Sequence, residues 1–311
     1  MDALCIVAAA MADRGYIADA VTLSTTCNDL FTYEPLWGII KNVQSPMNRT
    51  SLMYAARCGK VERFKWLLAR GADPHGVDTK GFSALHYASY HGHEEVVRIL
   101  IGLGVKLNEF TISPRGTPLN FAALHRHTEI VRMLCAAGAY CTTWLTSPAF
   151  DAIEYQFPSF SIQGMQSEEQ ADRVSGEIID ILYKAGMRLR ADEDVAAYIK
   201  VIGRGQVHTL RALMANGCNP MCFQYVVKHE PFLHLAIRCR RIEMLRELCK
   251  IGMWINGVNS MGRAPLDEID IHRKCYGELC YSTDLGVKLD AMEKILLEHG
   301  AKKMAYRSLN L

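Results

Sequence analysis

The sequence predicts an all-α solenoid of about seven stacked helix-turn-helix units, preceded by a small N-terminal helical cap. Glycines placed to end a second helix recur along the chain at successive separations of 33, 34, 48, 31, 35 and 48 residues: Gly71, Gly104, Gly138, Gly186, Gly217, Gly252 and Gly300. A small or apolar residue recurs in each first helix and gives a second, independent measure of the repeat period: Ala55, Ala88, Ala122, Ala152, Val201, Ala236 and Ile269. Two short helices cannot bury both their faces alone, so such units must stack on neighbours.

The clearest unit covers residues 81–104, with the sequence GFSALHYASYHGHEEVVRILIGLG. Leu85 and Ala88 lie on one face of a first helix, which Gly92 interrupts. A second apolar helix follows and ends at Gly104, where glycine can take the left-handed conformation that closes helices. This unit serves as the reference for the others.

Four segments carry a family resemblance: TSLMYAARCGKVERFKWLLARGADP from Thr50, SALHYASYHGHEEVVRILIGLG from Ser83, TPLNFAALHRHTEIVRMLCAAGA from Thr117 and FLHLAIRCRRIEMLRELCKIGMWIN from Phe232. They resemble the ankyrin repeat. The resemblance implies a non-catalytic protein-binding domain over residues 46–304. Arg126 stands where the inter-helix glycine of the third unit is expected, so we expect a strained or differently shaped turn there.

Residues 1–45 do not fit the repeat, and they carry five acidic residues against two basic ones. The stretch VTLSTTCNDLFTYEPLWGII resembles the second half of an F-box, although the usual opening leucine-proline pair is absent. The resemblance implies docking on the Skp1 subunit of a cullin-type ubiquitin ligase, through a surface drawn from Leu23, Cys27, Leu30, Pro35, Leu36 and Trp37. The alternative is that this segment only caps the apolar end of the first repeat.

Two units are longer than the period of about 33 residues that such repeats have. Their insertions are expected as loops between the first and second helix, near residues 154–176 and 272–286. Residues 305–311 form a C-terminal tail.

A binding surface is expected from the residues that precede the inter-helix glycine of each unit, because stacking aligns them in one concave strip. This strip is basic and aromatic, which favours a partner of acidic or extended polar character. The candidate residues are Arg57, Tyr90, His91, Leu124, His125, Arg204 and Arg238, flanked by Cys58, Gly203 and Cys239.

The hairpin tips between units are predicted to extend this surface, with Phe82 and Met261 exposed. Their candidate residues are Arg49, Thr79, Lys80, Phe82, Arg115, Met261 and Arg263. Asn108 and Asn256 each lie eight positions after a leucine, which resembles the context in which ankyrin hairpin asparagines are hydroxylated. The alternative for both is an asparagine that bonds its own turn.

The chain shows no pattern typical of catalysis or of a cofactor. His272, Cys275 and Cys280 match no zinc spacing, and Cys218 and Cys222 are better explained as core or turn residues. The histidines beside the turns are interpreted as residues that cap helices and bond the backbone. We therefore expect no enzyme activity, no metal and no cofactor.

Composition narrows the remaining functions. A formal charge of +2 is too balanced for non-specific binding to nucleic acid or membrane, and 11 scattered cysteines indicate a reducing compartment. The absence of an apolar run and of a basic N-terminal region argues against a membrane span and a signal peptide, so the cytoplasm is expected, with the nucleus as an alternative. The candidate functions are a ubiquitin-ligase substrate adaptor, a scaffold or inhibitor without that link, and, more weakly, a nucleic-acid binder.

Overall fold

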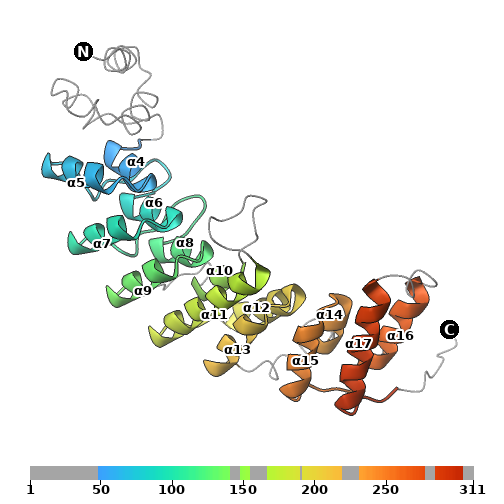
Figure 1. Ribbon diagram of the computed structural model, residues 1–311. Helices are drawn as coiled ribbons and strands as arrows, with labels where there is room; N and C mark the ends of the chain where they lie inside the picture. The colour runs from blue at the N-terminus through green and yellow to red at the C-terminus, as the bar shows by residue number, and fades with distance from the viewer. Residues whose placement is uncertain are drawn as a thin grey trace. The chain divides into compact units, whose positions relative to one another are not determined.

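The computed structural model describes residues 48–140, 148–154, 167–189, 191–218, 231–276 and 284–303. These residues form seven pairs of helices and, apart from an isolated bridge between Val77 and Ser83, no β structure (Figure 1). The chain divides into two compact units, unit 1 (Met1–Tyr155 and Ile181–Arg188) and unit 2 (Gln156–Asp180 and Leu189–Leu311). The expected N-terminal cap and C-terminal tail, with the F-box-like residues Leu23, Leu30, Pro35, Leu36 and Trp37, lie outside the described residues.

The described part of unit 1 contains the complete helices α4 (Ser51–Arg57), α5 (Val61–Ala69), α6 (Ala84–His91), α7 (Glu94–Gly102), α8 (Pro118–Leu124), α9 (Thr128–Ala136) and α10 (Pro148–Glu154). The first helices α4, α6, α8 and α10 pack in succession, and the second helices α5, α7 and α9 pack beside them (Figure 1). Each repeat thus contacts its neighbours, as the stacking argument requires.

Unit 2 repeats this arrangement with α11 (Glu168–Lys184), α12 (Ala191–Arg204), α13 (Val207–Ala215), α14 (Phe232–Arg238), α15 (Ile242–Lys250), α16 (Pro265–Tyr276) and α17 (Asp284–Glu298). The residues of α11 from Ile181 onward belong to unit 1. Helices α12, α14 and α16 pack in one row, and α13, α15 and α17 in a second.

Burial confirms the recurring residue that the sequence identifies in each first helix. All seven of these residues are 0% exposed: Ala55, Ala88, Ala122, Ala152, Val201, Ala236 and Ile269. The seven glycines at the ends of second helices all have φ between 69° and 89°. Within each unit, the described residues therefore form an all-helical stack of helix pairs.

Three first helices of unit 1 begin with the same N-cap arrangement. The hydroxyls of Thr50, Ser83 and Thr117 each accept a hydrogen bond from the backbone amide three residues later, at 3.3 Å. The side chain at that third position accepts in return from the N-cap amide, as Asn120 Oδ1 does from Thr117 N at 3.1 Å. These reciprocal bonds satisfy amides that a helix start leaves unpaired, which fixes where each repeat begins.

The turns between paired helices confirm the expected strain at Arg126. Gly59, Gly92 and Gly205 have φ of 66°, 82° and 76°, and Arg126 takes the same left-handed conformation at 60°. Arg240 does so as well, at 57°. A side chain in this region costs about 1 kcal/mol, so the stack imposes one turn shape at a local energetic cost.

The two insertions are shorter as loops than the sequence predicts. The first prediction, a loop over residues 154–176, is wrong after residue 167, because α11 already begins at Glu168, where two glutamates favour a helix N-terminus. The second, over residues 272–286, is wrong at both ends, since α16 continues to Tyr276 and α17 begins at Asp284. Arg273 on α16 pairs with Glu293 on α17 at 2.7 Å and with Asp290, which holds these helices together.

Candidate protein-binding surface

The C-terminal ends of α4, α6 and α8 bring the strip residues of unit 1 together. We call Arg57, Tyr90, His91, Leu124 and His125 the inner strip. Arg57 and His91 are exposed, whereas the other three are half-buried. The Tyr90 ring lies 4.1 Å from the His125 ring and 4.9 Å from the His91 ring, centroid to centroid. Tyr90, His91 and His125 therefore form one contiguous aromatic surface across two neighbouring repeats.

The histidines of the inner strip add no positive charge at neutral pH. Burial lowers the pKa of His91 to about 4, with further contributions from Arg57 and His93. Burial also lowers the pKa of His125 to about 4, with help from the neighbouring His127. Arg57 therefore supplies the positive charge of the inner strip.

The backbone of the inner strip is fixed by histidines of the following repeats. His93 Nε2 lies 2.8 Å from the carbonyl oxygen of Arg57, and His127 Nε2 lies 3.1 Å from that of Tyr90. Neither histidine caps its own helix through its side chain. The expectation that they bond the backbone is confirmed, but the carbonyl they reach belongs to the preceding repeat.

Unit 2 carries the two other strip candidates at equivalent helix ends. Arg204 is half-buried at the end of α12, and Arg238 is exposed at the end of α14. Arg241 takes the role of the histidines here, because its Nε donates to the carbonyl oxygen of Gly203 at 3.1 Å. The same repeat-to-repeat support therefore holds this part of the surface.

A buried carboxylate organises the first hairpin of unit 1. Asp78 is 4% exposed, and its side chain accepts from Lys80 N at 2.8 Å, from Phe82 N at 2.9 Å and from the Tyr87 hydroxyl at 2.7 Å. Burial and this hydrogen bond raise the pKa of Tyr87, so the phenol remains a donor. Arg49 completes the cluster with an ion pair to Asp78 at 3.5 Å. Arg49 therefore supports the hairpin from within, with a side chain only 22% exposed.

Phe82 does not form part of the surface, so the prediction of an exposed ring is wrong. It is 8% exposed and its ring centroid lies 5.4 Å from that of Phe121 and 5.3 Å from that of Tyr87. The ring packs inward because the hairpin returns toward α6 directly after Gly81. Thr79, Lys80 and Arg115, in contrast, are exposed as predicted.

The hairpin that precedes α16 in unit 2 has the same construction. Asn259 Oδ1 accepts from Met261 N at 3.0 Å and from Arg263 N at 3.1 Å, as Asp78 does in unit 1. Met261 is 70% exposed, which agrees with its expected position at the tip. Arg263 is half-buried.

Asn108 and Asn256 have a structural role that neither sequence interpretation describes. Asn108 Oδ1 accepts from Tyr140 N at 2.9 Å, and Asn256 Oδ1 accepts from Lys302 N at 2.7 Å. Each amide thus bonds the backbone of the next repeat instead of its own turn. Hydroxylation at either position stays a prediction.

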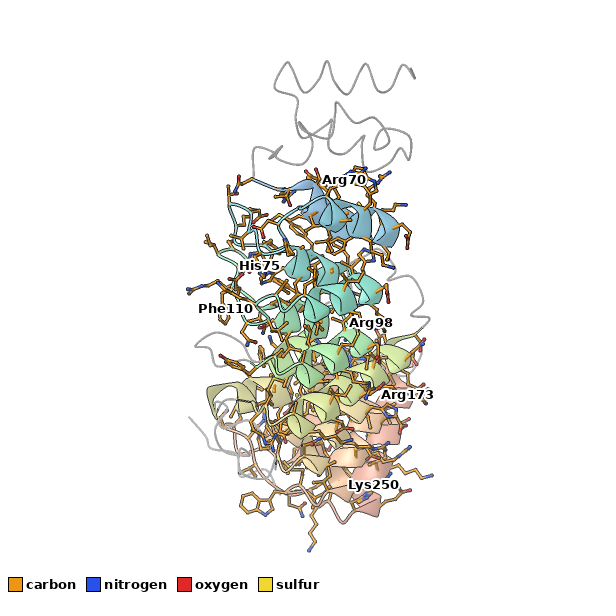
Figure 2. All side chains as sticks on the ribbon, turned by 90° about the vertical axis from the view of Figure 1, so that its left-hand side faces the viewer. Arg70, His75, Arg98, Phe110, Arg173 and Lys250 are labelled. Carbon is orange, nitrogen blue, oxygen red and sulfur yellow. The ribbon has the colours of Figure 1, made fainter. Side chains whose placement is uncertain are left out.

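Sequence reasoning missed the apolar side chains that the hairpins of unit 1 expose. Val77, Phe110, Ile112 and Tyr140 are 41%, 37%, 67% and 53% exposed. Figure 2 shows Phe110 and His75 on one side of unit 1, and Arg98, from a second helix, on the opposite side. The sequence signal for their exposure was the polar and glycine-rich sequence around each of these residues. A core position would instead continue a helical period.

The described residues contain no group of three side chains of the kind that hold a metal ion. His272 and Cys275 lie on α16 and not in a loop, while Cys222 and Cys280 lie outside the described part of the chain. No described helix is both long and apolar enough to span a bilayer.

Comparisons with known proteins agree with the stacked helix pairs described above. A family model described as "Ankyrin repeats (3 copies)" matches residues 20–111 and 52–144. Together these matches cover residues 20–144, less than half of the chain, and the helix pairs from α4 to α9 lie within them. The first of these matches begins inside the segment that resembles an F-box.

Two curated relatives contain the same repeat. The chain is 40% identical over 57 residues to human "Ankyrin repeat domain-containing protein 39" and 40% identical over 62 residues to "Notch-regulated ankyrin repeat-containing protein" of Xenopus tropicalis. These matches cover 18% and 19% of this chain, and they span only 31% and 54% of the two relatives.

Among solved structures, the human ASB11 ankyrin repeat domain is similar with a TM-score of 0.59 at 21% identity. The match covers 82% of this chain and 100% of that domain. At this level of identity the similarity shows a shared fold.

Proposed function

We propose that this chain is a non-catalytic protein-binding module that holds its partner on the inner strip. The observation that carries the proposal is the contiguous surface formed by Tyr90 with His91 and His125, in which His127 fixes the backbone at Tyr90. A rigid, partly exposed aromatic group loses little conformational entropy on binding, which is why tyrosine contributes strongly to protein interfaces. In unit 2, the proposed binding residues are Arg204 and Arg238.

Charge reversal tests this proposal on the partner that co-purifies with the intact chain from native cells. The triple change Arg57→Glu, Arg204→Glu and Arg238→Glu is expected to weaken partner binding by about 100-fold or more while helicity, measured by circular dichroism, stays the same. Because the pKa values of His91 and His125 are lowered to about 4, both rings stay neutral from pH 6 to pH 8, and their contribution to the affinity should not change over this range.

A matched triple change on second helices serves as the control. Arg98, Arg132 and Arg246 are exposed, and each forms an ion pair with a glutamate three residues earlier. Their replacement by glutamate changes the net charge equally and should leave partner binding intact. Equal losses from both triple variants would show that the strip is not the binding surface.

In its more specific form, the proposed module is a substrate adaptor, in which residues 1–45 hold a Skp1-type subunit and the repeats from residue 46 to residue 304 select the client. This form rests on the F-box resemblance of that segment. The scaffold or inhibitor function is the second candidate, and one observation favours it: the ankyrin family model already matches from residue 20, as a segment that caps the first repeat would.

A pull-down with purified Skp1 separates these two forms. The adaptor form predicts that the intact chain binds Skp1 and that deletion of residues 1–45 removes the binding. The scaffold form predicts no binding by either chain. Equal Skp1 binding before and after the deletion would contradict the adaptor form as proposed.

A further inference from the structure

The exposed apolar side chains of unit 1 gather on the loops between its repeats. Five large apolar residues are the most exposed ones in the described part of unit 1. One of them, Leu103, does not belong to these loops and follows α7. The other four belong to the loops that connect successive repeats: Val77, Phe110, Ile112 and Tyr140. We call these four residues, together with Lys80 and Arg115, the hairpin face. Apolar groups gathered in this way indicate a surface that another molecule covers.

The hairpin face is held in place by contacts between successive loops. Ile112 N donates to the carbonyl oxygen of Lys80 at 2.7 Å, which joins the second hairpin to the first. A Cβ atom at Gly81 would lie 3.0 Å from the carbonyl oxygen of Phe110, so the two loops are in close contact. Tyr140 is fixed by the bond from its amide to Asn108. Such a surface would lose little conformational entropy on binding.

The charge of the hairpin face is positive. Lys80 and Arg115 are exposed, and neither forms an ion pair with any described residue. Of the three acids in these two hairpins, Asp78 is buried in its hydrogen bonds, Glu109 pairs with Lys106 at 3.0 Å, and Asp73 is exposed. A partner with carboxylates beside its apolar groups would therefore complement this face.

We propose that the hairpin face binds an extended polypeptide segment in which apolar and acidic residues are interleaved. The apolar side chains would contact Phe110, Ile112 and Tyr140, and the carboxylates would pair with Lys80 and Arg115. A polypeptide is favoured over a lipid surface because basic membrane-binding clusters typically contain about 4–8 lysines or arginines, more than this face offers. This inference rests on the proposed protein-binding function and names the chemistry of the partner.

A random library of 15-residue peptides displayed on phage, selected against the full chain, provides the probe. The expected result is a selected pool enriched in aspartate and glutamate beside leucine, isoleucine or aromatic residues. Synthetic copies of the enriched peptides are then measured by fluorescence anisotropy. A pool enriched in lysine and arginine, or no enrichment, would overturn the inference.

Two double variants locate the contact. Phe110→Ser with Ile112→Ser should weaken peptide binding about 30-fold or more, as loss of apolar anchors does. Lys80→Glu with Arg115→Glu should weaken it at least about tenfold, and more in low salt than in high salt. All four side chains are exposed, so thermal unfolding should show no large loss of stability.

The controls are Leu103→Ser, an exposed apolar residue outside the face, and Arg98→Glu on the opposite side of unit 1 (Figure 2). Both should bind the peptides as the unchanged chain does. Peptide binding that survives both hairpin variants overturns this inference, whereas the proposed function still stands if the strip variant loses its native partner. Sedimentation with phosphatidylserine vesicles that depends on Lys80 and Arg115 would also overturn it, in favour of a membrane surface.

Discussion

Replacing Asp78 with Ala is expected to lower the free energy of unfolding of unit 1 by about 3 kcal/mol. The variant leaves the amides of Lys80 and Phe82 and the hydroxyl of Tyr87 without their acceptor in a site where the Asp78 side chain is 0% exposed. Urea unfolding of the full chain measures the loss, and hydrogen exchange at the Lys80 and Phe82 amides should become faster.

The matched controls for this variant are Asp78→Asn and Asp73→Ala. Asparagine can still accept from both backbone amides, as Asn259 does in the hairpin of unit 2, so we expect a smaller loss of about 1 kcal/mol. Asp73 accepts one exposed hydrogen bond, from His75 N, and its removal should cost no more than about 0.5 kcal/mol. An Asp78→Ala variant no less stable than Asp73→Ala would contradict the assigned role.

Replacing Gly92 with Ala is expected to lower the free energy of unfolding by about 3 kcal/mol. Gly92 has φ of 82°, which already disfavours a side chain, and its added Cβ would lie 2.6 Å from the His127 ring. The ring would have to move, and its bond to the carbonyl oxygen of Tyr90 would be disturbed. The inner strip should therefore lose part of its partner affinity as well.

Gly104→Ala serves as the control for Gly92→Ala, because it carries the energetic cost of a left-handed backbone with a side chain but no steric clash. Gly104 has φ of 69°, and an added Cβ would meet no atom within 4 Å. We therefore expect a loss of only about 1 kcal/mol. In a double-mutant cycle, His127→Ala should reduce the additional cost of Gly92→Ala, and strictly additive losses would show that the ring is not the cause.

Periodicity made the repeats readable, because each first helix has a small or apolar residue at the helix contact and each second helix ends at a glycine with left-handed backbone. Ala88 and Gly104 illustrate both requirements and could be found from the sequence alone. The helical extensions at Glu168 and Tyr276 could not be found from the sequence alone. They interrupt the period and depend on contacts such as the ion pair of Arg273 with Glu293.

The candidate surface was less predictable than the fold. The positions of Arg57, Tyr90 and His91 follow from their place before the turn. Whether a ring at a hairpin is buried, as Phe82 is, or exposed, as Phe110 is, depends on the direction in which the loop returns to the next helix. The charge state of His91 likewise depends on burial by neighbouring repeats.

The sequence by itself determined that the chain stacks helix pairs and which recurring residue of each first helix lies in the core, because these properties recur from repeat to repeat. The tertiary structure decided which polar groups are already satisfied by a neighbouring repeat and which groups remain available to a partner. His93, His127, Asn108 and Asn256 all bond the backbone of an adjacent repeat. Their partners lie about one repeat away along the chain, beyond the reach of local sequence patterns.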